Sequence, residues 1–216
     1  DAANYNTGLG VDVFAALTSG DENTAVGTGA LGLSTTASGN TAVGRNALLA
    51  NTTGTRNTAL GYATLDASTT GDYNTAVGGL ALSTNTTADN NTGVGFQALY
   101  LNTTGTSNVA LGALALDANT TANNNTAVGY ASLSANTTGA ENTSVGDLSS
   151  DANTTGSYNT ALGRNALGAN TTANFNTAVG RLSLFTNSTG ASNTAVGSGS
   201  LQNNTTASNN TAVGAD

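Results

Sequence analysis

The 216-residue sequence contains no cysteine, histidine, lysine, proline, methionine or tryptophan. Without cysteine there is no disulfide framework and no thiol chemistry, so cysteine use says nothing about the redox compartment. Without histidine and cysteine, the usual nucleophile and base pairs of acyl transfer are missing. We therefore expect a protein that is not an enzyme and that uses no cofactor and no metal.

Charge is also scarce. Only 7% of the residues are charged, and twelve acidic residues against four arginines give a net charge of -8. A basic footprint for nucleic acid is absent, and so is the Lys/Arg-rich face that binds an anionic membrane. No run approaches the ~20 apolar residues of a membrane-spanning helix, and no signal peptide is recognisable. We expect no nucleic-acid partner and no membrane insertion.

What the sequence does contain is a repeat. The pentapeptide Asn-Thr-Ala-Val-Gly, with small variations, recurs every seventeen residues from Asn6 to Asn210 without insertion or deletion. Such spacing indicates a stack of equal coils, because one slipped residue would break every ladder above it. Low charge alone would suggest disorder, but the hydrophobic residues keep the same phase in every repeat. We therefore predict an ordered, all-β parallel β-solenoid of about twelve full coils, about 60 Å long at a stacking distance of ~4.8 Å.

In each repeat, the asparagine that begins the pentapeptide is position one. Thr-Ala-Val is predicted to form a strand and the following Gly a sharp corner. The next segment is either a second strand or one helical turn, and Asn-Thr-Thr forms the closing turn. Residues 1–22 form a divergent first coil, a cap or junction, and residues 23–216 the regular solenoid, uncapped at its C-terminal end.

Two apolar columns are expected to form the core. The fourth and ninth positions are almost always Val or Leu, and we expect them to face each other across a thin interior. The members are Val26, Val43, Leu60, Val77, Val94, Leu111, Val128, Val145, Leu162, Val179 and Val196 at the fourth position, and Leu48, Leu65, Leu82, Leu99, Leu116, Leu133, Leu167 and Leu184 at the ninth.

Small residues at the third position are expected to point away from that core. A flat row of this kind either faces solvent or lets another subunit approach closely, and we favour subunit association. The row consists of Ala25, Ala42, Ala59, Ala76, Ala127, Ala161, Ala178 and Ala195. At the two ends of the stack, we expect Val11, Phe14 and Val213 to make end-to-end contacts if coils of different chains stack. The alternative is that the chain is a segment of a longer protein.

The motifs "NTAVG", "AL" and "NTTG" carry a family resemblance. They resemble the repeats of bacteriophage tail fibres and of bacterial surface proteins, and are similar to the head repeats of trimeric autotransporter adhesins. The resemblance implies a parallel β-roll, a fibrous extracellular role and a homo-oligomer, with a trimer among the options. The seventeen-residue period is longer than that of the adhesin heads, so their coil shape does not transfer directly.

The side chains that are chemically capable of catalysis or metal binding have simpler interpretations. Asp66, Asp117 and Asp151 share the tenth position but lie two or three coils apart, too far for a retaining glycosidase pair. A Ca²⁺ site at Asp21-Glu22 is a weaker alternative to a solvated acidic turn. The sequons of the closing turn, Asn-Thr-Thr in every case but Asn-Ser-Thr at Asn187, are interpreted as turn ladders rather than glycosylation sites. They begin at Asn51, Asn85, Asn102, Asn119, Asn136, Asn153, Asn170, Asn187 and Asn204.

The sequence therefore favours a non-catalytic structural protein that forms an extracellular fibre, on a cell surface or in a virion, with copies of itself as partner. One alternative is an adhesin or receptor-binding head that binds surface glycans through Tyr62, Phe96 and Tyr130, which recur at the sixth position of every second coil. A less favoured alternative is an ice-binding protein that uses the threonine columns at positions thirteen and fourteen, for example Thr52 and Thr53.

Overall fold

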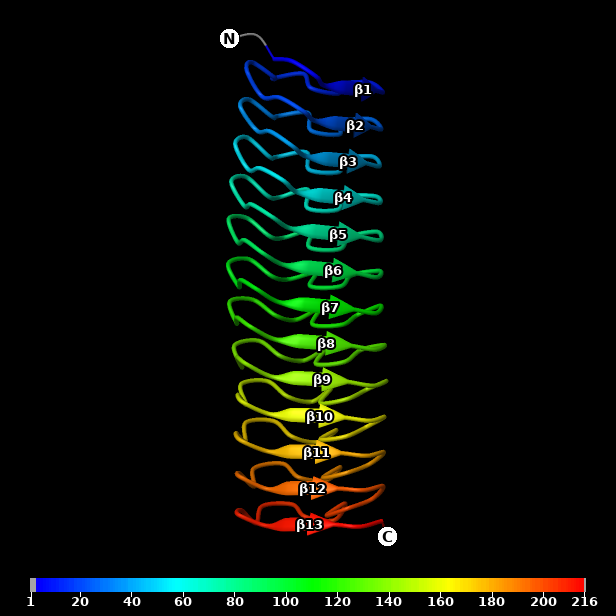
Figure 1. The fold of residues 1–216 in the computed structure, drawn as a ribbon, viewed down its shortest axis with the longest axis vertical. Coiled ribbons are helices and arrows are strands. Elements are labelled where there is room, and N and C mark those ends of the chain that lie inside the picture. Colours follow the sequence, from blue (N-terminus) through cyan, green and yellow to red (C-terminus); the bar gives the residue numbers. More distant parts are fainter. Residues whose placement is uncertain (1–2, 216) are drawn as a thin grey trace.

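The structure is a single straight column of stacked coils. The computed structural model describes residues 3–215 and places thirteen short strands in one parallel sheet, in sequence order (Figure 1). The expected parallel β-solenoid is confirmed, and residues 3–215 contain no helix. The strands are β1 (Thr7–Leu9), β2 (Thr24–Val26), β3 (Thr41–Val43), β4 (Thr58–Leu60), β5 (Thr75–Val77), β6 (Thr92–Val94), β7 (Val109–Leu111), β8 (Thr126–Val128), β9 (Thr143–Val145), β10 (Thr160–Leu162), β11 (Thr177–Val179), β12 (Thr194–Val196) and β13 (Thr211–Val213).

The structural period equals the sequence period. Thr75 of β5 is paired with Thr92 of β6, and Val77 with Val94, each seventeen residues further along the chain. The same register holds at every junction from β1 to β13. Equivalent residues of successive coils therefore lie in columns parallel to the rod axis, and the side-chain chemistry of each repeat position is repeated along one line.

The segment after each strand is a run of turns, neither a second strand nor a helix. Its seventh and ninth positions adopt left-handed backbone conformations, with φ of 62° at Leu80 and 53° at Leu82. The N–H of Leu80 donates to the carbonyl of Tyr62 in the preceding coil, while that of Leu82 donates to Ala98 in the following coil. Backbone N–H groups of this segment therefore donate to both the preceding and the following coil. They are paired although the segment is not a strand.

Glycine at the fifth position is required by the close approach of successive corners. Gly78 has φ of 119°, and a Cβ atom on it would lie 2.7 Å from the carbonyl carbon and oxygen of Gly95. No real Cβ makes contacts that short, and few L-residues adopt this φ. The invariant glycine therefore keeps consecutive coils at hydrogen-bonding distance.

The apolar interior is built from the third, eighth and ninth positions. In the coil that begins at Asn74, the side chains of Ala76, Ala81 and Leu82 are completely buried. The leucine packs onto the strand residue of the next coil, since a Cβ atom at Gly93 would lie 3.4 Å from the Leu82 side chain. The interior is thus one leucine wide, with alanine or glycine on the strand that faces it.

The expected core register of the strands is therefore wrong. Threonine and valine do share one face, but this face points outward, because the thin interior has room only for a small residue opposite the leucine. The fourth-position residues Val26, Val43, Leu60, Val77, Val94, Leu111, Val128, Val145, Leu162, Val179 and Val196 lie half-buried or exposed on the outside of the sheet.

The expected interface row is wrong for the same reason. The alanines at the third position are fully buried within one chain and cannot contact another subunit. All eight have no exposed surface: Ala25, Ala42, Ala59, Ala76, Ala127, Ala161, Ala178 and Ala195.

The apolar column at the ninth position is interrupted in one coil, at Ser150. Buried Ser144, Ser149 and Ser150 occupy the third, eighth and ninth positions there, and separate two hydrophobic clusters. The Ser144 hydroxyl donates to the carbonyl of Ser149 at 2.9 Å and lies 2.7 Å from its hydroxyl. These contacts satisfy hydroxyl groups that would otherwise be costly to bury.

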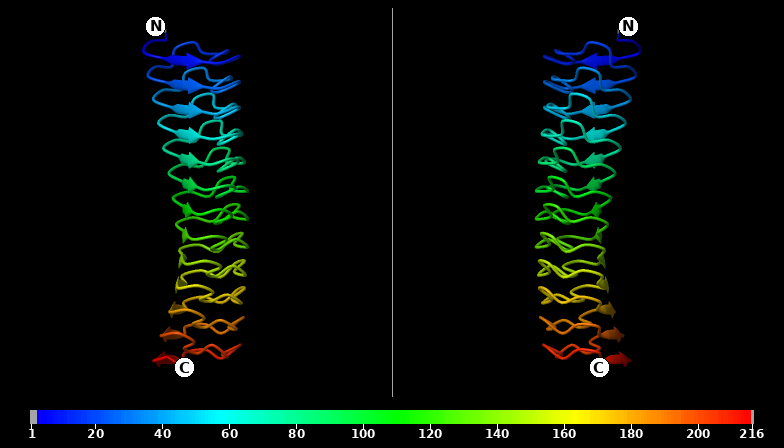
Figure 2. Two further views of the ribbon diagram at one scale, coloured as in Figure 1. Left: turned by 90° about the vertical axis from the view of Figure 1, so that its right-hand side faces the viewer. Right: turned by 90° about the vertical axis from the view of Figure 1, so that its left-hand side faces the viewer.

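The rod twists gently along its axis. Figure 2 shows the strand arrows turning steadily from the N-terminal end to the C-terminal end, as expected for stacked strands with the usual sheet twist. The two ends of the chain lie at opposite ends of the rod (Figure 1).

One pair of substitutions at neighbouring positions tests the observed register. Ala127→Leu would force a large side chain into the filled interior, and we expect it to lower the free energy of unfolding by about 1–3 kcal/mol. Val128→Leu places on the outward face the residue already present at Leu60 and Leu111, and should change stability by less than about 0.5 kcal/mol. Urea unfolding followed by circular dichroism measures both. Equal losses would contradict the inward position of the alanines.

Candidate functional site

The most regular polar feature is a column of buried asparagines at the first repeat position. The backbone N–H and the side-chain Nδ2 of Asn40 both donate to Oδ1 of Asn23, at 3.0 and 3.2 Å. The same Nδ2 also donates to the carbonyl of Gly54 at 2.9 Å. Asn40 thus joins the preceding coil to the closing turn of its own coil. Equivalent asparagines make similar contacts along the rod.

A second buried column occupies the twelfth position. Nδ2 of Asn102 donates to Oδ1 of Asn85 and to the carbonyl of Gly105, each at 2.9 Å. These two asparagines begin Asn-Thr-Thr sequons, and their side chains have no exposed surface. In the folded chain they hold the turn ladder together and are not accessible to a glycosyl donor.

The twelfth-position column is incomplete near the N-terminal end. Serine replaces asparagine at Ser34 and Ser68, on either side of Asn51. Ser34 Oγ, Asn51 Oδ1 and Ser68 Oγ are buried and have no hydrogen-bond partner among the described residues. The shorter serine side chain does not reach the next coil, so the amide chain is broken there.

The threonine columns of the closing turn divide into two kinds. At the thirteenth position the hydroxyl of Thr52 donates to the carbonyl of Thr69 in the next coil at 3.0 Å, and this contact repeats along the rod. At the fourteenth position the side chain, as in Thr53, is exposed. The thirteenth-position hydroxyls are therefore committed to holding the coils together and do not form a free array for binding ice.

The acidic residues are dispersed over the turns. Within residues 3–215, no three His, Cys, Asp or Glu residues are close enough to hold a metal ion. Asp21 uses its Oδ1 to accept a hydrogen bond from the backbone N–H of Asn4 at 2.7 Å. Its carboxylate thus contributes to the contact between the first coil and the residues before it.

Two tenth-position carboxyl groups have altered acidity. Desolvation by burial raises the pKa of Asp117, and hydrogen bonds from backbone N–H groups lower it by a smaller amount. Burial likewise raises the pKa of Asp151, with a further contribution from the negative charge of Asp147. The two carboxyls lie two coils apart, roughly 10 Å at the stacking distance, so they do not form a paired acid and base.

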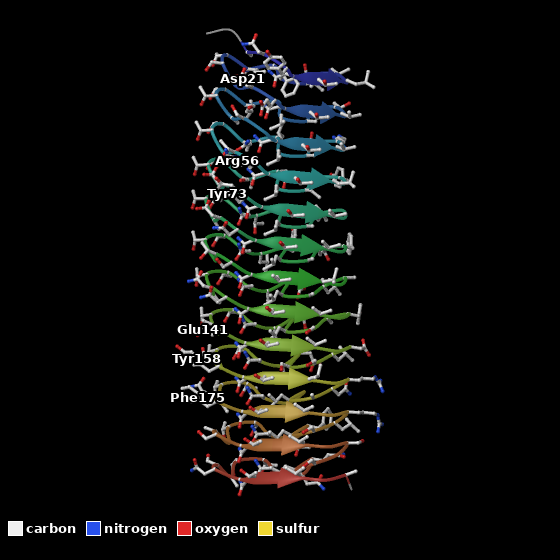
Figure 3. All side chains as sticks on the ribbon, viewed as in Figure 1. Asp21, Arg56, Tyr73, Glu141, Tyr158 and Phe175 are labelled. Carbon is white, nitrogen blue, oxygen red and sulfur yellow. The ribbon has the colours of Figure 1, made fainter. Side chains whose placement is uncertain are left out.

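The long side chains of the turns pair along the rod. Arg164 Nε lies 3.2 Å from Asp147 Oδ2, as the shared sixth position predicts, and both side chains are about half exposed. The rings of Tyr158 and Phe175 stack with centroids 5.1 Å apart and an interplanar angle of 8° (Figure 3). Exposed ion pairs contribute at most about 1 kcal/mol, so these pairs tune the surface rather than determine the fold.

A further pair and a small notch lie near the N-terminal end. The guanidinium of Arg56 hydrogen-bonds the Tyr73 hydroxyl and lies 5.4 Å from the centre of its ring (Figure 3). Sequence inspection missed this pair, although both residues occupy the seventeenth position of adjacent coils. Beside it, the absence of a side chain at Gly39 leaves an open notch of about 140 Å³ between Glu22 and Arg56. Ser38 and Thr55 complete its lining.

The residues expected to make contacts at the ends of the stack differ in their exposure. Val11 and Val213 are exposed, at 65% and 78%, whereas Phe14 is half-buried and packs against the first apolar cluster. Phe14 thus covers the N-terminal end of the leucine column.

The comparisons with known proteins identify no relative. No protein-family model, no curated protein and no solved structure matches this chain. Among residues 3–215 there is also no helix that is long and apolar enough to cross a membrane.

Removing one amide from the first-position column tests its structural weight. Asn108→Ala deletes the side-chain donor to Ala122 and the acceptor for the backbone N–H of Asn125, which are 2.8 and 2.9 Å away. The Ala122 carbonyl keeps a hydrogen bond from Asn119 Nδ2 at 3.1 Å, but the backbone N–H of Asn125 would be left buried and unpaired. We therefore expect a loss of about 1–3 kcal/mol in the free energy of unfolding. The exposed Asn203→Ala is the control and should cost less than about 0.5 kcal/mol. Similar values for both variants would show that the ladder does not stabilise the fold.

The raised pKa of Asp117 predicts a particular pH dependence. The folded chain binds this proton more tightly than the unfolded chain, so the cost of burying the carboxylate is present at pH 7 and is lost as the pH falls through the folded-state pKa. Asp117→Ser, which introduces the residue found at Ser134 in the next coil, should raise stability at pH 7, because no carboxylate has to be desolvated. Near pH 4, the ordinary range of a carboxyl, the difference from the parent should shrink. A constant difference in urea unfolding at both pH values would contradict the role of burial.

Proposed function

We propose that this chain is a structural rod of an extracellular fibre and has no catalytic role. The observation that carries the proposal is the unbroken register of β1 to β13, in which every coil repeats the pairing of the previous one. The rod becomes longer with each added coil. Every coil offers the following coil the same backbone and amide groups that the preceding coil offered to it. Such a stack is suited to spanning distance.

Resistance to bending comes from several parallel ladders. The strand ladder, the two asparagine columns and the thirteenth-position threonine column all run along the axis, at different points around the coil. Bending the rod would stretch at least one of them. The location outside the cell or in a virion rests on the resemblance of the repeat to tail-fibre and bacterial surface repeats.

A second candidate function is binding of surface glycans. Tyr62, Phe96 and Tyr130 are 52%, 54% and 54% exposed and recur at every second coil, with Gly79 and Ala113 between them. Their separation is roughly 10 Å at the stacking distance. Exposed rings at a regular interval can stack on sugar rings of a linear polysaccharide, and binding to a glycan array would test this alternative.

Deleting one coil tests the rod. Removal of residues 108–124, one complete seventeen-residue repeat, joins Ser107 directly to Asn125, which has the same repeat position as Asn108. We expect a folded rod that is shorter by about 4.8 Å and has a nearly unchanged melting temperature. Small-angle X-ray scattering and electron microscopy measure the length.

The control is a deletion that breaks the period. Removal of residues 108–122, two residues fewer, shifts every following column out of register and should destabilise the rod strongly.

Antibodies against the chain should label filaments outside the cells or particles that carry it. A chain that bends freely, or labelling confined to the cell interior, would contradict the proposed role.

A further inference from the structure

The outward face of the sheet is unlike the rest of the rod surface. It consists of the first and last residue of every three-residue strand, which are repeat positions two and four and are mainly threonine and valine. This surface is called the outward face below. None of the residues of β1 to β13, all within residues 3–215, is charged, although the chain carries a net charge of -8. The charges lie in the turns, so repulsion between two copies would be weakest where their outward faces meet.

Leucine occurs on this face at a fixed interval. Leu9, Leu60, Leu111 and Leu162 are fifty-one residues apart, which is three coils of seventeen, and the fourth position of the remaining coils is valine. Leu60, Leu111 and Leu162 are each 47% exposed within a single chain. A larger side chain every third coil gives the face a regular corrugation along the rod.

The size of the outward face is adequate for a specific contact. Thirteen strands at ~4.8 Å give a length of about 60 Å, and three residues per strand give a width of about 10 Å. One copy therefore offers about 600 Å², and two copies would bury about 1,200 Å² together, the lower end of the range for stable interfaces. A contiguous uncharged face of this area, with exposed leucines among half-buried valines, is typical of an interaction site.

We propose that the outward face is the contact between two copies of this chain, packed sheet against sheet. Uncharged β-branched faces pack in this way at about 10 Å in β-sandwiches. A shift of one coil along the axis between two parallel copies places each leucine of one face opposite valines of the other, where the smaller side chain leaves room. Both copies have the same twist (Figure 2), so the pair winds gently to keep the faces together.

The leucine pattern also favours a second copy of the chain over crystalline ice as the ligand of the outward face. A flat crystal lattice is matched by identical residues in every coil, but this face has a protruding leucine every third coil and Val109 in place of threonine. A corrugated surface with the same period fits better, and a second copy of the chain supplies it.

This inference rests on the proposed structural role and adds the surface through which copies associate. Sedimentation velocity over a range of concentrations should show the parent chain at twice its mass of 20.9 kDa. Leu60→Lys combined with Leu111→Lys should weaken association at least about a hundredfold, about tenfold for each leucine. The folded rod should persist, because both leucines are half exposed in the single chain.

The matched control places the same two charges elsewhere. Leu33→Lys with Leu101→Lys changes two leucines that are 53% and 42% exposed at the eleventh position, off the outward face, and should leave association unchanged. Leu60→Val with Leu111→Val gives the valine found in most coils, cannot disrupt folding by charge, and should still weaken association about tenfold or more.

Three results would overturn the inference: a parent chain that is monomeric at every concentration, equal association of the face and control variants, or thermal hysteresis from the monomer, which would assign the face to ice. A monomer whose length still scales with the number of coils would remove the contact between copies but leave the structural role intact.

Discussion

The fold depends on hydrogen bonds that join each coil to the coils before and after it. The buried asparagine columns show this constraint most clearly. Oδ1 of Asn40 accepts from the backbone N–H of Asn57 in the following coil, and its Nδ2 donates to Asn23 in the preceding coil and to a turn carbonyl. In the twelfth-position column, Oδ1 of Asn102 accepts from the side chain of Asn119 instead. An unpaired buried amide is costly, so an amide of this kind is stable inside the protein only if its neighbours repeat it. Regularity of the sequence is thus a condition for burying so many polar groups.

The same constraint explains the unusual interior. Successive coils approach so closely at the fifth position that only glycine fits, and the coil is so thin that a leucine from the turn segment meets an alanine on the strand. Several residues per coil, such as Leu82 and Tyr73, hold left-handed conformations that are unfavourable for a side chain. Hydrogen bonds to neighbouring coils hold them there, so the backbone strain is distributed along the rod and is stabilised collectively.

Filling the interior with alanine, leucine and asparagine leaves the larger residues for the surface. The charged side chains lie on the turns, where they make exposed pairs such as Asp147 with Arg164. The outward face carries the hydrophobic residues that the interior has no room for, with a leucine at every third coil. The proposed contact between two copies rests on this uncharged face.

The repeat spacing was enough to specify the solenoid, its period, its strands and its glycine corners. A constant seventeen-residue interval places equivalent residues next to each other whatever the shape of the coil. The spacing did not specify which face of the strand points inward. A three-residue strand alternates regardless of direction, and hydrophobicity favoured burial of Val77 over Ala76. The packed coil reverses that expectation, because the leucine from the return segment fills the thin interior and leaves space for a methyl group alone.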